Sequence, residues 1–367
     1  MNSAQNNLQS ATGLTLADWE TFLKDLGQPK FRANQIAEWL YSKRANSFDA
    51  MTNLGKSLRH SLSNQFKISE LEKVSVTGSS DTTQKYLFRL HDDRLIETVL
   101  IPATQALFGE KSDRRTLCVS SQVGCAFDCK FCASGLAGLT RNLSAAEIVS
   151  QVLQVERESG ESVQNLVFMG MGEPLANLKN LKQALEILNS DWGVNIGARK
   201  MTISTSGVAP AIEKLAELPM QIRLAISLHG ATDDVRSRIM PVNEKFNIDR
   251  LFQALDVWSA KKKQKITFEY ILIDGVNDDL EQARVLAQRA NRLRAKVNLI
   301  PYNTVEGLPW KRPETDHQEA FLNILTQAGV KATLRREKGH DIAAACGQLR
   351  LQEETAQGII PKAEKVR

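Results

Sequence analysis

The chain has 367 residues, of which 42% are apolar, so it can bury the core of one large or two smaller domains. Its 47 basic and 42 acidic residues leave a formal charge of +5, which is compatible with a polyanionic partner but does not establish one. No stretch approaches the roughly 18 apolar residues of a membrane span, and no basic residue precedes Lys24, unlike the start of a signal peptide. We therefore expect neither a membrane-embedded nor a secreted protein.

The first 13 residues are polar, and we expect a disordered tail there. Residues 14–72 have a helical pattern, in which apolar side chains recur at intervals of three and four and Thr15 stands where an N-cap is expected. Gly27 and Pro29 end the first helix. This unit is either a small bundle with solvated charges or an RNA-binding accessory domain. Its second helix has a basic edge formed by Lys30, Arg32, Lys43 and Arg44.

Residues 73–110 have the period of strands, with SSD and HDD as turns, which predicts a β-hairpin linker. Strands and helices then alternate over residues 111–352, and a polar tail follows at 353–367. Six β–α units predict an α/β fold with a parallel sheet, whose chemistry collects at the carboxyl ends of the strands. The expected strands are TLCVSSQ, NLVFMG, KMTIST, IRLAISLH, ITFEYILI and KVNLIPY.

Cysteine usage carries more information than composition. The odd number of five cysteines, with three inside eight residues, is a poor disulfide framework and is typical of thiol chemistry in a reducing compartment. A cytoplasmic location is therefore expected. The cysteines are Cys118, Cys125, Cys129, Cys132 and Cys346.

The strongest motif is C-x3-C-x2-C, formed by Cys125, Cys129 and Cys132 directly after the first expected strand of the alternation. Three thiolates on one loop can bind three corners of an iron–sulfur cluster and leave its fourth iron open. A structural zinc site would need a fourth ligand, and none stands at the usual spacing. Here the chain resembles the radical S-adenosylmethionine (SAM) enzymes, whose signature also has an aromatic residue before the last cysteine, as Phe131 does. The resemblance implies that SAM chelates the open iron.

Polar residues follow the other expected strands at their carboxyl ends. The segment MGMGEP alone reads as a tight βα turn, but the radical SAM resemblance implies that its Gly172 and Glu173 contact the amino group of the cofactor. A lone His is more often packed than functional, and an Asn often only closes a turn. Several such clusters at strand ends nevertheless indicate one shared site. The further candidates for cofactor binding are Ser204, Ser227, Leu228, His229 and Asn303.

With these segments the resemblance narrows to the RlmN-type RNA methyltransferases. FMGMGEPLAN, STSGV, SLHG, NLIPYN and RREKGHDIAAACGQL occur in the order of that family, and the likeness runs from about residue 14 to 350. It implies a partial (β/α)6 radical SAM barrel with one [4Fe–4S] cluster and SAM. It also implies methylation of adenine C2 in 23S ribosomal RNA and certain transfer RNAs, an electron donor such as flavodoxin, and a monomer.

The same resemblance assigns roles to three catalytic residues. One SAM methylates Cys346, a second SAM supplies a radical that activates this methyl group, and Cys118 releases the product by forming a disulfide with Cys346. Glu97 matches the residue that accepts the C2 proton in that family, although Cys118 could remove this proton instead. From the residues alone, Glu97 could equally be a charge on an exposed hairpin face, and Cys346 a buried structural thiol. Two other functions stay open, a C8 methyltransferase of the Cfr type (or another radical enzyme) and a metal-stapled RNA-binding adaptor without catalysis.

Overall fold

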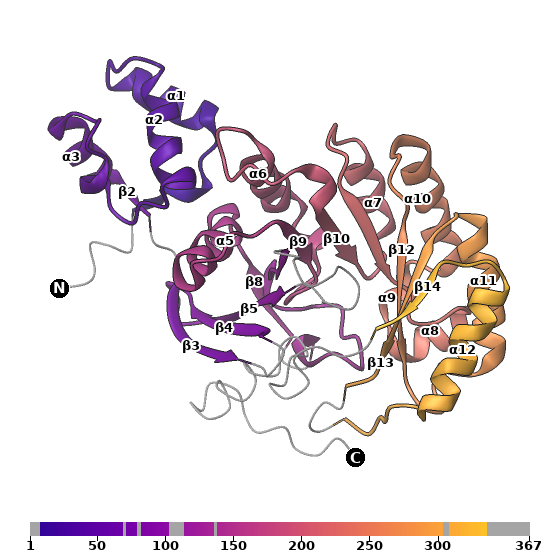
Figure 1. The fold of residues 1–367 in the computed structure, drawn as a ribbon. Coiled ribbons are helices and arrows are strands. Elements are labelled where there is room, and N and C mark those ends of the chain that lie inside the picture. Colours follow the sequence, from indigo (N-terminus) through magenta and orange to yellow (C-terminus); the bar gives the residue numbers. More distant parts are fainter. Residues whose placement is uncertain are drawn as a thin grey trace.

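The computed structural model describes residues 8–68, 71–78, 82–102, 114–135, 138–303 and 308–335. Cys346 and the expected polar tail at 353–367 therefore lie outside the described residues. A helical N-terminal unit stands beside a large sheet that is lined with helices (Figure 1). Among the described residues, no helix combines the length and the apolar content that crossing a membrane requires.

The N-terminal unit consists of short helices closed by a two-stranded pairing. Thr15 begins the first long helix with the expected cap, because its hydroxyl accepts the Asp18 N–H at 3.2 Å and the Asp18 carboxylate accepts the Thr15 N–H at 2.8 Å. The elements are β1 (Gln9–Ser10), η2 (Ala11–Gly13), α1 (Leu16–Asp25), α2 (Arg32–Ala37), the π-helical η3 (Glu38–Ser42), η4 (Phe48–Ala50), α3 (Lys56–Gln65) and β2 (Phe66–Lys67).

Residues 8–13 are ordered, which corrects the expected disordered tail over its second half. Strand β1 pairs in parallel with β2, and η2 is buried. The Thr12 hydroxyl lies 3.1 Å from the Ser150 hydroxyl of α5 (Ala145–Ser159), and a Cβ on Gly13 would lie 3.0 Å from the Ala146 Cβ. Small residues are buried here by a distant helix, so polar composition alone could not predict order.

The N-terminal unit packs on α5 and on α6 (Leu178–Asn189). Arg44 forms an ion pair with Glu156 of α5, and the Gln183 side chain of α6 donates to the Gly13 carbonyl at 2.7 Å. One continuous apolar core extends from the N-terminal helices through α5 and α6 to the sheet. The unit is therefore docked on the sheet domain through its own core.

Ten strands form one sheet in the order β14-β13-β12-β11-β10-β9-β6-β5-β4-β3. The seven from β6 to β14 are parallel, which confirms the predicted α/β alternation and adds β14, a short strand beyond the six expected. The strands are β3 (Glu72–Gly78), β4 (Gln84–Arg89), β5 (Leu95–Pro102), β6 (Arg115–Cys118), β9 (Asn165–Phe168), β10 (Met201–Thr205), β11 (Arg223–Ser227), β12 (Thr267–Leu272), β13 (Lys296–Pro301) and β14 (Ala332–Leu334).

The β-hairpin linker expected over residues 73–110 corresponds to strands β3, β4 and β5, which extend this sheet. The three strands form an antiparallel meander, and β5 pairs with β6 so that Val99 lies opposite Cys118. Pairing with β6 gives β5 a neighbour on both sides and buries it. A linker with two free edges would leave the backbone groups of β5 exposed.

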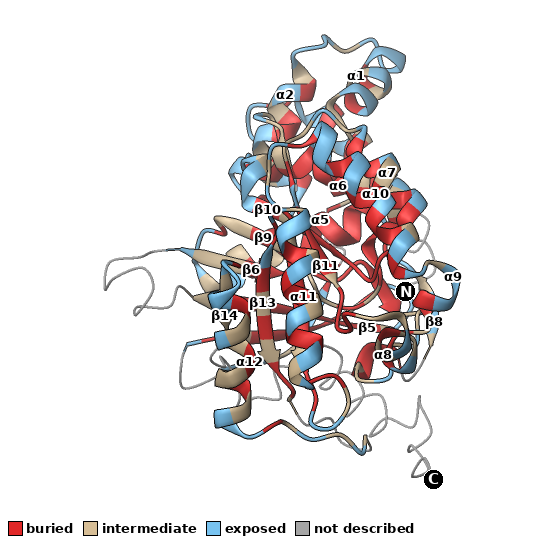
Figure 2. Ribbon diagram, turned by 90° about the vertical axis from the view of Figure 1, so that its right-hand side faces the viewer, coloured by how far each residue is buried: buried red, intermediate tan, exposed pale blue. Residues whose placement is uncertain are grey.

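Helices cover the outer side of the sheet, and the buried residues concentrate between the two layers (Figures 1 and 2). Ser144 caps α5 with a second capping box, to Glu147. Besides α5 and α6, the helices are α7 (Ala209–Ala216), α8 (Asp233–Ile239), α9 (Val242–Lys245), α10 (Ile248–Lys261), α11 (Leu280–Arg292) and α12 (Thr315–Gln327), with the short η5 (Ala133–Gly135), η6 (Pro174–Asn177) and η7 (Ala198–Lys200).

The side of the sheet that faces away from these helices is called the inner face below. In β5 the Thr98 hydroxyl donates to the Gln151 side chain of α5 at 2.8 Å, so Thr98 faces the helices. Because side chains alternate along a strand, Glu97 and Val99 belong to the inner face. Sheet pairing then assigns Cys118 to the same face, since it lies opposite Val99.

Candidate functional site

A cavity of about 270 Å³ lies at the carboxyl ends of the parallel strands. Polar side chains that follow four different strands line it, as the sequence predicted for one shared site. The predicted residues on its wall are Cys125, Cys129, Cys132, Gly172, Glu173, Ser204, Ser227 and His229.

The three loop cysteines, Cys125, Cys129 and Cys132, lie between the strands of a small hairpin formed by β7 (Gln122–Gly124) and β8 (Leu139–Asn142). The Cys125 N–H donates to the Gly138 carbonyl at 3.0 Å, and the Lys130 N–H donates to the carbonyl of Ile239, at the end of α8. The loop is thus held at its start and in its middle, so that all three thiols border one cavity.

The surroundings of the loop cysteines suit a positively charged cluster. Burial raises the pKa of Cys125 to about 12 and raises that of Cys129 well above its ordinary value, so a bound cation favours the thiolate form of both. Within the described part of the chain, no three Cys, His or carboxylate groups converge closely enough to hold one ion. Three thiols that border one cavity fit a cluster, because each thiolate binds a different iron.

The turn after β9 is shaped by its glycines and by Glu173. Gly172 has φ of +94°, and a Cβ there would lie 2.4 Å from the Gln122 Cβ. The Glu173 carboxylate accepts the Ser206 N–H at 2.7 Å, the Ser206 hydroxyl at 2.8 Å and the Leu175 N–H at 3.0 Å. Burial raises the pKa of Glu173, and these bonds oppose that rise. Glu173 therefore holds two turns of the cavity wall together.

His229 is a neutral group on the cavity wall. Its Nδ1 accepts the Ile271 N–H at 3.0 Å, so the neutral ring carries its proton on Nε2. Burial, with a smaller effect of Arg236, lowers its pKa to about 3. The Phe131 ring lies edge-on to it, with ring centroids 4.8 Å apart. His229 can thus act as a hydrogen-bond donor whose charge does not change near neutral pH.

Two predicted cofactor residues are not on the cavity wall. Leu228 is fully buried in the apolar core, although its carbonyl accepts the Arg236 guanidinium at 3.1 Å. Asn303 lies at the end of a described segment, where its side-chain oxygen accepts the Arg312 guanidinium at 2.6 Å. The contacts seen for both within the described residues are structural, and their role toward a cofactor stays a prediction.

Three residues at the site escaped the sequence analysis. Glu269 of β12 and Arg335 line the cavity, and burial raises the pKa of Glu269 to about 7. Arg236 of α8 is fully buried and donates to the carbonyls of Leu228 and Ser206. Glu269 lies inside a strand and Arg236 inside a helix, where neither belongs to a motif, and Arg335 begins the segment RREKGHDIAAACGQL but was not singled out. Strand alternation could have identified Glu269, since it pairs with Ser227 across β11 and β12.

The predicted catalytic residues Cys118 and Glu97 lie on the inner face, outside the set of residues that line the cavity. Both are buried, at 6% and 2% exposure. Burial of Glu97 excludes the alternative that it is a charge on an exposed hairpin. Ser204 shares this face, because Cys118 pairs with Val167, Val167 pairs with Thr202, and Ser204 follows Thr202 by two residues.

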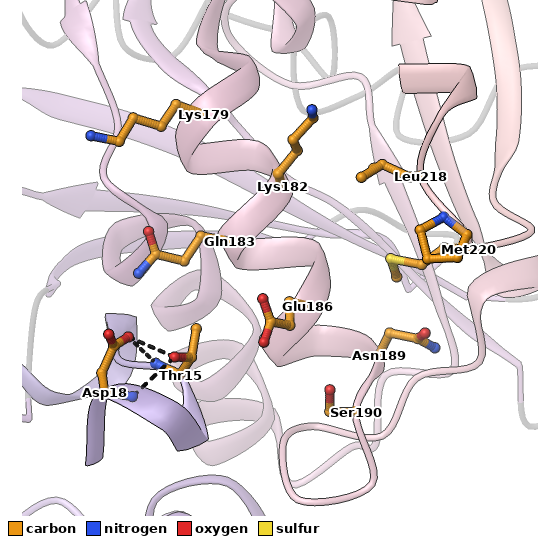
Figure 3. Close-up of a pocket in the computed structure, with 11 residues that line it drawn as sticks. Thr15, Asp18, Lys179, Lys182, Gln183, Glu186, Asn189, Ser190, Leu218 and Met220 are labelled. Carbon is orange, nitrogen blue, oxygen red and sulfur yellow. Dashed lines mark hydrogen bonds between the residues drawn. The ribbon is translucent and has the colours of Figure 1, made fainter. Parts of the chain in front are cut away.

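A larger cavity, of about 620 Å³, lies elsewhere, between α1 and α6 (Figure 3). Thr15 and Asp18 lie on one side of it, and side chains of α6 such as Lys182 and Glu186 lie on the other. None of the predicted site residues lines it. Its position at the junction of the two units identifies it as a gap between packed elements rather than the reaction site.

A parallel α/β sheet with three cysteines on the loop after its first parallel strand defines a radical SAM enzyme. The radical SAM superfamily profile matches residues 119–287, and the profile described as the ribosomal RNA large subunit methyltransferase N-terminal domain matches residues 9–68. The second match also places the start of the accessory domain before residue 14.

Full-length relatives agree with these matches. A probable dual-specificity RNA methyltransferase RlmN of Akkermansia muciniphila is 55% identical over 91% of this chain and 93% of its own. The dual-specificity RNA methyltransferase RlmN of Campylobacter fetus is 45% identical over 89% and 95%. The crystal structure of a radical SAM methyltransferase from Sphaerobacter thermophilus has 43% identity and a TM-score of 0.87, covering 93% of this chain and 98% of that one. The chain therefore belongs to the RlmN family of radical SAM RNA methyltransferases, which use a [4Fe–4S] cluster and SAM.

Proposed function

We propose that this chain methylates C2 of adenine in 23S ribosomal RNA and in certain transfer RNAs through an S-methylcysteine intermediate on Cys346. C2 of a purine is an amidine carbon and not a nucleophile, so it cannot attack a sulfonium methyl group directly. The observation that carries the proposal is that Cys118 and Glu97 share the inner face with residues of the cofactor cavity.

The three loop cysteines are the residues that would hold the cluster, and His229, Ser204 and Ser227 would border SAM. When bound there, the cluster and SAM supply one-electron radical chemistry, with one electron taken in per turnover and returned when the purine ring regains aromaticity. Glu173 keeps two turns of the cavity wall in register through its bonds to Ser206.

Three side chains then carry the methyl group and the protons. The methylated Cys346 loses a hydrogen atom, and its methylene carbon bonds to adenine C2. The C2 proton passes to the Glu97 carboxylate. The Cys118 thiolate attacks the Cys346 sulfur, and the electron pair of the sulfur–methylene bond passes to carbon, which takes up a proton to become the methyl group. A disulfide between Cys118 and Cys346 remains, to be reduced before the next turnover.

Sheet register supports a joint role for Glu97 and Cys118. Glu97 is two residues from Val99, the direct partner of Cys118 on the neighbouring strand. Such diagonal neighbours on one face are about 7–8 Å apart. An adenine ring between the base and the resolving thiol would therefore meet both side chains.

We include the RNA-binding role of the N-terminal unit in this proposal. Its surface combines basic and aromatic side chains, which suits phosphate contact and base stacking. Phe31 is 54% exposed, with the Arg32 guanidinium carbon 5.0 Å from its ring centroid. Lys43 Nζ lies 4.1 Å from the ring centroid of Trp39. An electron donor such as flavodoxin and a monomeric state belong to the same proposal.

Mass spectrometry of nucleosides tests the proposed function. Anaerobically reconstituted protein is incubated with SAM, a reductant and unmodified 23S RNA or transfer RNA, and the RNA is digested. The expected products are 2-methyladenosine and 5′-deoxyadenosine, with neither formed by the Cys129→Ala control. 8-Methyladenosine would instead identify a Cfr-type enzyme, and the absence of 5′-deoxyadenosine would favour a binding adaptor.

A further inference from the structure

Lys85 and Glu97 form a wholly buried ion pair. Lys85 Nζ lies 2.8 Å from Glu97 Oε2, and the side chains are 0% and 2% exposed. Withdrawing two charges from water is costly, and apolar residues in place of a buried pair often leave a protein equally stable or more stable. A contribution to stability is therefore a weak explanation for the presence of this pair. Its position on the sheet suggests a functional explanation.

The pair lies next to the resolving thiol. Lys85 of β4 pairs with Val99 of β5, which pairs with Cys118 of β6, so these three residues form one row across the inner face. Glu97 belongs to the next row, opposite Leu87. The Lys85 side chain thus reaches diagonally to Glu97. Its ammonium contacts the group to which we assign proton transfer.

We propose that Lys85 is a positioning residue whose ammonium, as the contacting counter-charge, holds the Glu97 carboxylate in place for removal of the adenine C2 proton. The inference rests on the proposed function of Glu97. In the step concerned, hydrogen leaves C2 as a proton and bonds to a Glu97 oxygen, while the electrons of the carbon–hydrogen bond stay in the ring. Lys85 exchanges no proton in this step and acts only through its contact with the Glu97 carboxylate.

Few other charges face this pair from the described residues packed around it. The inner face of β6 contributes the titratable thiol of Cys118, and β5 contributes no further charge there. One step outward along β4 and β3, Arg89 and Glu72 face each other with their charged atoms 3.8 Å apart. In that second pair the two charges balance each other, and the Glu72 side chain is largely exposed. Among the described residues, Lys85 is the cation whose ammonium directly contacts the Glu97 carboxylate.

Three variants test the inference, namely Lys85→Met, Lys85→Arg and Glu97→Gln. Each is reconstituted, checked for fold by circular dichroism and for iron content, and followed in single turnover with RNA from pH 6 to pH 9.5. Lys85→Met removes the ammonium that contacts a buried carboxylate, and such a loss favours the protonated form of a carboxyl group, which cannot accept a proton. At pH 7 we expect 5′-deoxyadenosine at the wild-type yield but methyladenosine formation slower by about 100-fold, the lower range of a general base effect.

The pH dependence separates positioning from mere packing. The deficit of Lys85→Met should shrink as pH rises, Lys85→Arg should follow the wild-type profile, and Glu97→Gln should be slow at every pH. RNA carrying 2-deuteroadenosine should show a larger isotope effect with Lys85→Met than with wild type. If Lys85→Met does not fold, Lys85→Gln, which keeps a polar side chain of similar size, takes its place.

The outcomes distinguish the two claims. Wild-type methylation by Glu97→Gln would overturn the assigned role of Glu97 itself. A slow Glu97→Gln together with a Lys85→Met or Lys85→Gln profile parallel to that of wild type, and with no larger isotope effect, would overturn only the role of Lys85. An equal loss of methyladenosine formation in Lys85→Arg and Lys85→Met at all pH values would also overturn the role of Lys85.

Discussion

Replacing Gly172 with alanine probes how closely the turn after β9 is packed against the loop after β6. The new Cβ would lie 2.4 Å from the Gln122 Cβ and 2.7 Å from its Cγ, on a residue whose φ is +94°. Gln122 cannot swing away freely, because its side-chain oxygen accepts the Glu173 N–H at 2.7 Å and its amide donates to Asn142 at the same distance. The added carbon therefore strains the turn that carries Glu173.

The size of the effect follows from two costs. A positive φ costs an L-residue about 1–2 kcal/mol, and an extra carbon in a packed site costs about 1–3 kcal/mol. We expect Gly172→Ala to lower the free energy of unfolding by about 2–5 kcal/mol. Urea unfolding of the reduced, cluster-free chain, followed by circular dichroism, measures this loss. Formation of 5′-deoxyadenosine by the reconstituted variant should fall as well, since Gly172 lines the cavity.

Alanine substitutions at two other glycines separate the cost of the positive φ from the cost of the extra carbon. Gly275 has φ of +63° and open space around a Cβ, so Gly275→Ala should lose only about 1–2 kcal/mol. Gly197 has φ of −58° and equally open space, so Gly197→Ala should match wild type within about 0.5 kcal/mol. A Gly172→Ala variant no less stable than Gly275→Ala would refute the packing argument.

Three further predictions concern the cysteines and His229. Replacing any one of the three loop cysteines with alanine should abolish stable iron binding, measured as iron content after anaerobic reconstitution, whereas Cys118→Ala should retain its iron; the reverse pattern would refute the ligand assignment. With RNA and SAM, Cys118→Ala should accumulate a covalent protein–RNA adduct on denaturing gels, and Cys346→Ala should form none; normal turnover by Cys118→Ala would rule out the two-cysteine release. Because burial lowers the pKa of His229 from 6.5 to about 3, the unfolded chain binds more protons than the folded one below pH 6.5. This residue alone should therefore reduce stability by about 2 kcal/mol between pH 7 and pH 5, and His229→Gln should show a correspondingly weaker loss in urea titrations; equal losses would contradict the shift.

Local sequence determined the elements and the cofactor loop of this protein. Alternation of strand and helix periods needs only neighbouring residues, so the six expected parallel strands were predictable, as was the capping box of Thr15. The three loop cysteines are likewise a local feature, since eight residues contain all the ligands. Strand-end chemistry follows from the parallel topology, which is why Glu173, Ser204 and His229 were found at one cavity.

Tertiary structure decided which side chains are buried and what they meet. Glu97 is an exposed charge or a buried one according to whether β5 has neighbours on both sides, and that depends on pairing with β6. The contact of Lys85 with Glu97 is set by the register of β4 on β5, where a shift of one residue would turn Lys85 to the other face. Leu228 follows a strand like its neighbours but points into the core, because alternation sends every second side chain there. Such outcomes depend on contacts between segments far apart in the chain, and local periodicity contains no record of those contacts.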